Sequence, residues 1–167
     1  MRKTVLARDL MKGPVRQLTT RTLVRDAAAF LLRHGISGAP VIDDHGRWIG
    51  VFTQNDLARY VQERIRPKTS GRTLESRESV EVDFEALPDQ FGETPVQDLM
   101  TLGLYTVFPE ATLEEVVHTL TTFKVHRVFV IQETGTSLLG VITTMDVLRW
   151  LDENQGVEPK HRKVAKR

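Results

Sequence analysis

The chain has 167 residues, of which 40% are hydrophobic and 27% charged, and its formal net charge is +1. This length allows one compact domain or two small fused units, and the near balance of charge gives no reason to expect nucleic-acid or anionic-lipid binding. Cysteine is absent, which excludes a disulfide framework, a zinc ribbon, an iron–sulfur site and thiol catalysis. No apolar run approaches the roughly 18 residues of a membrane helix, and no signal-peptide pattern is present, so we expect a soluble cytoplasmic protein.

Four short blocks of sequence occur twice in the same order, 89 or 90 residues apart. The pairs are Asp9-Leu10-Met11 with Asp98-Leu99-Met100, Thr22-Leu23 with Thr112-Leu113, Val41-Ile42 with Val130-Ile131, and Gly50 to Asp56 with Gly140 to Asp146. A spacing that changes by one residue indicates small loop insertions around a shared scaffold. The sequence therefore predicts two homologous units, at residues 5–61 and 94–151.

Both units predict the same elements in the same order: helix, strand, strand, helix. The expected elements of the first unit are a helix from near Thr22 that stops at Gly35, a strand at 39–42, a turn at 43–46, a strand at 48–52 and a helix after Thr53. Those of the second are a helix with a capping box of Thr112 and Glu115, a strand at 128–131, a turn at 133–136, a strand at 138–142 and a helix after Thr143. One such unit has too few strands to bury both faces of a sheet, so we expect the two to pack together.

Two segments lie outside the repeats. Residues 62–93 are basic and then acidic, with apolar residues among the acids. They form either a partly mobile linker that docks on a neighbouring surface or a segment that binds a partner or covers a dimer interface. Residues 152–167 end in a short basic tail, which either solubilises the protein or makes a weak contact with an anion or nucleic acid.

The repeated motif Gly-h-h-Thr-x-x-Asp (h, hydrophobic) carries the functional information. Its copies place Thr53 before Asp56 and Thr143 before Asp146, each at a strand-to-helix junction. This arrangement can be a helix cap alone, with the hydroxyl accepting from a first-turn amide and the carboxylate stabilising the helix N-terminus. The same groups can hold a ribose phosphate, because free amides suit phosphate and a carboxylate accepts from both ribose hydroxyls.

Two copies of this motif, in register with the other blocks, resemble cystathionine-β-synthase (CBS) domains. The strand sequences Ile36-Ser37-Gly38-Ala39-Pro40-Val41-Ile42-Asp43 and His126-Arg127-Val128-Phe129-Val130-Ile131 carry the same resemblance. It implies an α/β (α+β) fold in which two β-α-β-β-α units pack with pseudo-two-fold symmetry. It also implies clefts that bind AMP, ADP, ATP or S-adenosylmethionine, with magnesium as a companion of a polyphosphate, and a homodimer.

The resemblance assigns roles to matching positions. Asp56 and Asp146 would hold ribose hydroxyls, and Thr53 and Thr143 would contact phosphate or ribose. The base would lie beside residues of the strand openings, namely Ile36, Ser37, Gly38, Ala39 and Pro40 in one cleft, and Val125, His126, Arg127, Val128 and Phe129 in the other.

His126 and Arg127 resemble a His-Arg pair in the nucleotide-sensing subunit of AMP-activated protein kinase. There such residues reach the phosphates of a nucleotide held by the other repeat. The matching residues of the first unit, Ser37 and Gly38, carry no charge, so the two clefts are not equivalent. We expect the Asp56 cleft, with His126 and Arg127 reaching across, to bind phosphate better. His126 is otherwise a surface or half-buried histidine, and Arg127 otherwise pairs with the acidic linker.

The leading function is a non-catalytic regulatory module that senses adenosine ligands and acts through dimer packing or an unknown protein partner. The alternative is a ligand-free assembly module in which Thr and Asp only cap helices. No nucleophile–base pair, Walker-A pattern or Gly-x-Gly-x-x-Gly pattern is recognisable, so we do not expect an enzyme. The five histidines share no ligand spacing, so we expect no dedicated metal site.

Overall fold

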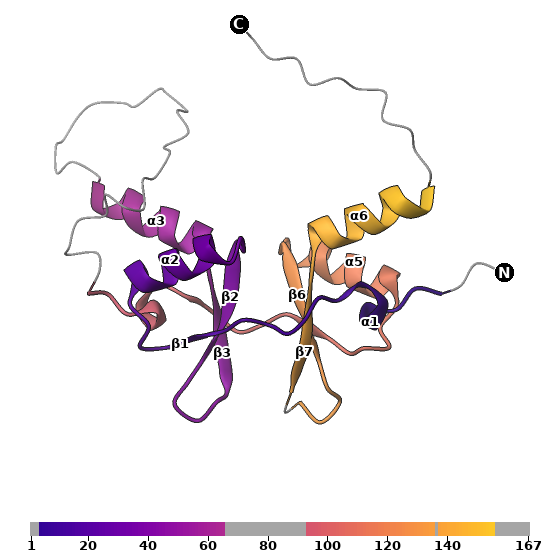
Figure 1. Cartoon of the computed structure of the whole chain (residues 1–167), viewed down its shortest axis with the longest axis horizontal. Coiled ribbons are helices and arrows are strands. Elements are labelled where there is room, and N and C mark those ends of the chain that lie inside the picture. Colours follow the sequence, from indigo (N-terminus) through magenta and orange to yellow (C-terminus); the bar gives the residue numbers. More distant parts are fainter. Residues whose placement is uncertain (1–3, 66–92, 136, 156–167) are drawn as a thin grey trace, which may run out of the picture. The chain divides into compact units, whose positions relative to one another are not determined.

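The computed structural model of the chain describes residues 4–65, 93–135 and 137–155 (Figure 1). The interpretations of the linker and of the basic tail therefore fall almost entirely outside the described residues. The helices that flank these two segments extend into them, to Ile65 and to Gln155.

Each repeat folds as β-α-β-β-α, which contains the helix, strand, strand and helix predicted from the residue pattern and has the order that the resemblance implies. The first repeat consists of β1 (Leu18–Thr19), α2 (Val24–Arg33), β2 (Gly38–Ile42), β3 (Trp48–Thr53) and α3 (Gln54–Ile65). The second consists of β5 (Thr106–Val107), α5 (Leu113–Thr122), β6 (Arg127–Ile131), β7 (Leu138–Thr143) and α6 (Thr144–Gln155). Short elements precede the repeats: α1 (Ala7–Leu10) before the first, and the 3₁₀ helix η2 (Val96–Asp98) and β4 (Thr101–Leu102) before the second. The predicted α/β class is confirmed.

The chain forms two compact units that do not coincide with the two repeats. The first unit comprises residues 16–104, and the second comprises residues 1–15 together with 105–167. Each unit thus combines one repeat with the segment that precedes the other repeat. We call residues 4–15 the N-terminal segment and residues 93–104 the middle segment.

Both segments lie along the hairpin of the repeat that they complete. In the first unit the sheet order is β1-β2-β3-β4, with β1 parallel to β2 and the other pairs antiparallel. In that sheet Thr101 of the middle segment pairs with Val51. In the second unit the sheet order is β5-β6-β7, and Lys12 of the N-terminal segment pairs with Val141. The two pairings occupy equivalent positions in the repeats.

Each unit has its own hydrophobic core beneath two helices. The first core consists of Leu18, Val24, Ala27, Ala28, Leu31, Ala39, Val41, Phe52, Leu57, Val61 and Val96. The second consists of Ala7, Leu10, Val116, Leu120, Val128, Val130, Ile142 and Val147. Leu10, from one Asp-Leu-Met block, therefore packs in the second unit, whereas Leu99 and Met100, from the other block, pack against the first core.

The ends of the first helix of each repeat follow the predictions with one exception. At α5 the Thr112 hydroxyl accepts from the Glu115 amide and the Glu115 carboxylate accepts from the Thr112 amide, which confirms the capping box. At α2 the residue before the helix is Leu23, and it makes no side-chain cap. The Thr22 hydroxyl instead accepts from the Thr19 amide, so the helix begins two residues later than expected. Gly35 follows the helix with φ of +60°, as a stop signal requires.

Candidate functional site

The Thr-x-x-Asp motif forms the same hydrogen-bonded arrangement in both units. The Asp56 Oδ2 atom accepts from the Thr53 amide at 2.8 Å and from the Thr53 hydroxyl at 2.6 Å, and the Asp56 amide donates to that hydroxyl at 3.3 Å. The bonds between Thr143 and Asp146 have the same three lengths. The motif is therefore a reciprocal helix cap, in which the hydroxyl accepts from a first-turn amide as the sequence predicts. It uses both acceptor positions of Oδ2 and the only proton of the hydroxyl.

The other carboxylate oxygen of Asp56 faces different groups. Its Oδ1 atom accepts from the Arg59 guanidinium at 2.7 Å and from the Thr101 hydroxyl at 3.1 Å. Thr101 lies in β4 of the middle segment, which precedes the second repeat in the sequence but packs on the first. This segment therefore completes the surroundings of the Asp56 carboxylate. Asp56 is 4% exposed, whereas Arg59 is largely exposed.

The Oδ1 atom of Asp146 is paired with two cations. Lys12 Nζ lies 2.5 Å from it and Arg149 Nη1 lies 3.5 Å from it. Lys12 follows Met11 as Thr101 follows Met100, so these two residues occupy equivalent positions in the N-terminal segment and the middle segment. Asp146 is buried, while the side chain of Lys12 is 59% exposed. The two motifs are thus identical at Oδ2 and different at Oδ1.

The surroundings of Asp146 also determine its pKa. Burial raises the pKa of this carboxyl, but hydrogen bonds from Lys12 and Thr143 outweigh burial and hold the pKa below its usual value. A carboxyl whose pKa is lower in the folded state contributes stability above its unfolded pKa, and this contribution is lost as pH falls through the folded pKa.

We therefore expect the free energy of unfolding of the Asp146→Asn variant to depend less on pH below about 4 than that of the wild type. Urea unfolding between about pH 2.5 and 6 measures this difference. Parallel pH dependences of the two proteins would contradict the expectation.

The predicted base-contacting residues lie directly beside the motif in each unit. The Gln54 amide donates to the Ser37 carbonyl and the Thr144 amide to the His126 carbonyl, both at 3.1 Å. Across the hairpins, Gly38 pairs with Thr53 and Arg127 with Thr143.

Burial separates these residues into two groups. Ala39, Pro40, Val128 and Phe129 are buried, whereas Ser37 and His126 are exposed. Ile36, Gly38, Val125 and Arg127 are partly buried. Because Ala39 and Val128 are part of the two hydrophobic cores, a ligand can meet these two positions only through the backbone.

Four residues that surround the carboxylates were not predicted from the sequence: Lys12, Arg59, Thr101 and Arg149. Arg59 and Arg149 follow the aspartates by three residues, which places them on the same helix face. Lys12 and Thr101 could have been found as the first residues after the two Asp-Leu-Met blocks. Their contact with the aspartates was not predictable from the sequence. Lys12 precedes the first repeat but packs with the second, and Thr101 precedes the second repeat but packs with the first.

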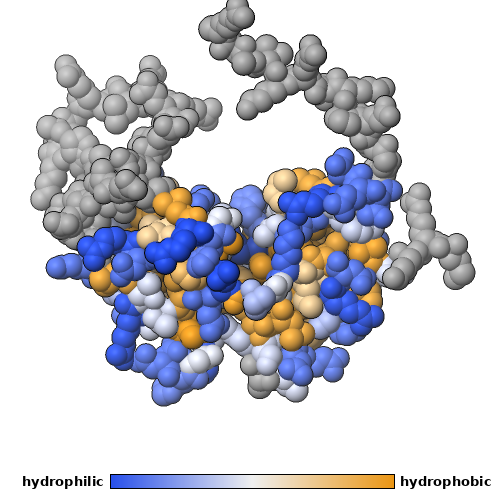
Figure 2. Space-filling model, viewed as in Figure 1, coloured by the Kyte–Doolittle hydropathy of each residue, from blue (hydrophilic) through white to orange (hydrophobic). Residues whose placement is uncertain are grey.

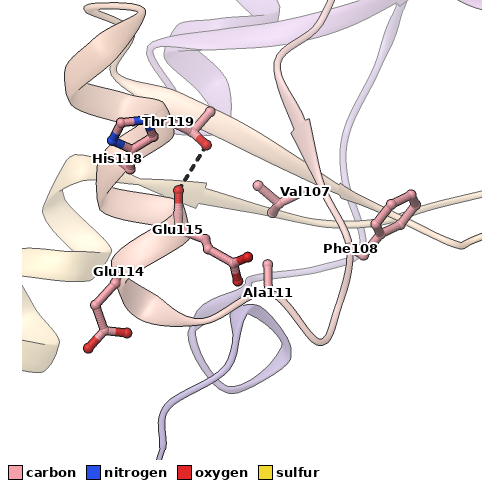
Figure 3. A pocket seen from close by; sticks show the side chains of 7 residues that line it. All are labelled: Val107, Phe108, Ala111, Glu114, Glu115, His118 and Thr119. Carbon is pink, nitrogen blue, oxygen red and sulfur yellow. Dashed lines mark hydrogen bonds between the residues drawn. The ribbon is translucent and has the colours of Figure 1, made fainter.

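A depression of about 530 Å³ lies between β5 and the start of α5 in the second unit (Figure 3). Val107, Phe108, Ala111, Glu114, Glu115, His118 and Thr119 line it. The Glu115 carboxylate is used in the helix cap, and its carbonyl accepts from the Thr119 hydroxyl at 2.9 Å. None of the predicted ligand-binding residues lines this depression, which is therefore separate from the Thr-x-x-Asp site.

In residues 4–65, 93–135 and 137–155, no group of three or more His, Asp or Glu residues is arranged to hold a metal ion. No helix there is long and apolar enough to cross a membrane.

The β-α-β-β-α fold occurs twice, and each copy has one buried aspartate in its helix cap. The chain is therefore a tandem pair of related domains. The family model of the CBS domain matches residues 7–63 and 96–153. The chain therefore belongs to the CBS domain family, as the sequence resemblance indicated.

Relatives of very different length share this similarity. The chain is 24% identical over 156 residues to the uncharacterized protein MJ1426 of Methanocaldococcus jannaschii, covering 88% of this chain and 91% of that protein. It is 26% identical over 147 residues to the 5'-AMP-activated protein kinase subunit gamma of Saccharomyces cerevisiae, and 27% identical over 147 residues to the A-adding tRNA nucleotidyltransferase of Aquifex aeolicus. Each match covers 88% of this chain, but only 39% of the kinase subunit and 14% of the transferase.

Solved structures of CBS domain pairs have the same fold. The CBS domain pair of protein MJ0100, in complex with 5'-methylthioadenosine and S-adenosyl-L-methionine, has a TM-score of 0.69 at 17% identity, covering 91% of this chain and 99% of that one. CBSX2 in complex with AMP has a TM-score of 0.64 at 24% identity, covering 90% and 98%. At these identities the similarity shows the fold.

Proposed function

We propose that the protein is a non-catalytic regulatory module that senses adenosine ligands such as AMP, ADP, ATP or S-adenosylmethionine. The observation that carries the proposal is the buried aspartate found twice at the same strand-to-helix junction, with identical bonds at Oδ2. In CBS domain pairs of the same fold, the bound molecules are 5'-methylthioadenosine, S-adenosylmethionine and AMP. All three contain an adenosine-type ribose.

In the proposed complex, the Oδ1 atoms of Asp56 and Asp146 accept hydrogen bonds from ribose hydroxyls. Oδ2 is already occupied by the threonine amide and hydroxyl in each unit. The proton of the Thr53 hydroxyl is donated to Asp56, and phosphate oxygens can only accept. We therefore assign Thr53 and Thr143 the role of orienting the carboxylate, with ribose rather than phosphate as their possible contact.

We propose that the adenine base lies beside the strand openings, Ile36 to Pro40 and Val125 to Phe129. Their backbone is adjacent to the motif through the bonds at Ser37 and His126. His126 and Arg127 would contact phosphate, as expected from the sequence. Magnesium would accompany only a polyphosphate ligand.

Ligand binding would act by changing the association of the protein with a second copy or with a protein partner. We propose a cytoplasmic location, which fits the absence of cysteine. Large hydrophobic side chains are exposed in both units, among them Leu32 and Leu102 in the first and Phe108, Phe123, Met145 and Leu148 in the second. Figure 2 shows hydrophobic atoms among hydrophilic ones on one face. A ligand shifts such an association only by its difference in affinity for the two states.

The alternative function is assembly without a ligand. It is favoured by one specific observation, the reciprocal cap, because Thr53 and Asp56 already satisfy each other and the helix end. The exposed hydrophobic side chains are compatible with this function too. The two functions differ in whether Oδ1 ever accepts from a ligand.

Asparagine variants separate these functions. In Asp56→Asn or Asp146→Asn, the amide oxygen can still accept from the threonine, while the amide nitrogen removes the acceptor at Oδ1. We expect thermal-shift measurements with AMP, ADP, ATP, NAD, S-adenosylmethionine and GTP to show stabilisation of the wild type by adenosine ligands. A ligand at 100 times its Kd adds about 2.7 kcal/mol.

The stabilisation should be reduced in one or both asparagine variants. No shift of the folded wild type with any ligand would contradict sensing and favour assembly. A shift that persists in a variant with both substitutions would show that the ligand binds elsewhere.

A further inference from the structure

We infer that Lys12, a second cation beside the carboxylate, makes the Asp146 site more selective than the Asp56 site for adenosine ligands that carry a negative charge. The inference rests on the proposed function, because it concerns the same two carboxylates. Among the groups that contact the carboxylates, the two sites differ in charge at one position, which is Lys12 in the second unit and Thr101 in the first.

The two residues are equivalent by sequence, by strand pairing and by target. Each follows the methionine of an Asp-Leu-Met block. Lys12 pairs with Val141 and Thr101 with Val51, at corresponding positions of the two hairpins. Each reaches the Oδ1 atom of the aspartate in its unit. A difference between them is therefore a difference between the two sites.

A ribose can bind the carboxylates only through Oδ1, because Oδ2 is saturated by the cap. At Asp56 the ribose meets the Arg59 guanidinium at 2.7 Å and the Thr101 hydroxyl at 3.1 Å, and this hydroxyl is neutral and can rotate to accept from the incoming hydroxyl. At Asp146 it meets the ammonium group of Lys12 at 2.5 Å, in a charge-assisted bond to a buried carboxylate. A neutral ribose must weaken this bond without offering the ammonium group another anion.

An anionic ligand removes this cost. The side chain of Lys12 is 59% exposed, so its ammonium group can turn from Asp146 toward a phosphate while the ribose takes its place at Oδ1. Arg149, at 3.5 Å, is the weaker partner of Asp146 and leaves Lys12 as the main competitor. Lys12 therefore opposes neutral nucleosides and favours phosphorylated ones at the same carboxylate.

The experiment isolates one site at a time in the full chain. Asp56→Asn leaves only the Asp146 site, to which AMP and adenosine are titrated by calorimetry, with and without Lys12→Thr. We expect the Asp146 site to prefer AMP by about tenfold or more, the ratio that one charge-assisted bond supplies. Lys12→Thr should weaken AMP and strengthen adenosine, so that the ratio falls toward one.

Matched variants test the same residue in other ways. Lys12→Arg should keep the preference for AMP, and Thr101→Lys combined with Asp146→Asn should increase the preference for AMP at the Asp56 site. Changes of opposite sign for the two ligands are the decisive result, because a loss of folding would weaken both.

Equal weakening of both ligands by Lys12→Thr would overturn the inference while leaving the proposed function intact. Binding to the Asp146→Asn protein but not to the Asp56→Asn protein would do the same, since Asp146 would then hold no ligand. Failure of AMP and adenosine to bind the wild type, together with the absence of any shift in the ligand screen, would overturn both.

Discussion

Replacing Gly50 with alanine is expected to lower the free energy of unfolding by about 3 kcal/mol, at the upper end of the range for overpacked sites. Gly50 is buried on β3, opposite Leu102 of β4. A Cβ atom there would lie 2.5 Å from the Thr101 carbonyl oxygen and 3.0 Å from the Met100 sulfur. The carbonyl belongs to the backbone of the paired strand, so no change of rotamer relieves the contact.

Gly46→Ala is the control for this substitution. Gly46 has φ of +74° and no atom within 4 Å of an added Cβ, so the substitution costs only backbone strain of about 1 kcal/mol. Urea unfolding compares the two variants. Hydrogen exchange adds a local readout, because the Gly103 amide donates to the Ile49 carbonyl across β3 and β4. Exchange at Gly103 should rise in Gly50→Ala only, and equal losses in both variants would argue against the close approach of the middle segment.

Leu10→Ala is expected to cost about 3 kcal/mol, the loss typical of a buried leucine. Leu10 is 7% exposed and packs among Val116, Ile142 and Val147 of the second unit. The same substitution in the other block, Leu99→Ala, should lower the free energy of unfolding by at least about 1 kcal/mol less than Leu10→Ala does, because Leu99 is only partly buried against its core. Urea unfolding measures both losses.

The location of the loss is as informative as its size. Leu10→Ala should speed hydrogen exchange in β7 and α6, which belong to the second repeat, and spare α2 of its own repeat. Faster exchange in α2 with no change in α6 would mean that the N-terminal segment packs on the repeat that follows it directly.

The main elements were predictable because their signals are local. The Thr112 and Glu115 pair marks a helix start within four residues, and Gly35 marks a helix end. The hairpins follow from two short apolar runs separated by a turn that contains Gly46 or Gly135, both of which have positive φ. Thr22 was misleading because its hydroxyl accepts from a turn amide, at Thr19, rather than from the helix.

The packing of each segment on the more distant repeat, which we call the exchange of segments, was not predictable. The two Asp-Leu-Met blocks are identical, so Leu10 and Leu99 satisfy the hydrophobic pattern of either unit equally well. The two-residue strands β1, β4 and β5 are too short to show any periodicity. The motif aspartates were predictable, but Lys12 was not recognised as a neighbour of Asp146, because their contact joins residues 134 positions apart.

The exchanged segments also affect the order in which the protein can fold during synthesis. The first unit is made of residues 16–104, so it can be completed as soon as these have left the ribosome. The N-terminal segment is made earlier, yet its partners Val141 and Ile142 are among the last of the described residues to be made. Its apolar residues stay without the sheet that buries them until the second repeat has been made. A circular permutant that joined this segment to the end of the second repeat would remove the delay, because each unit would then be one continuous stretch of chain.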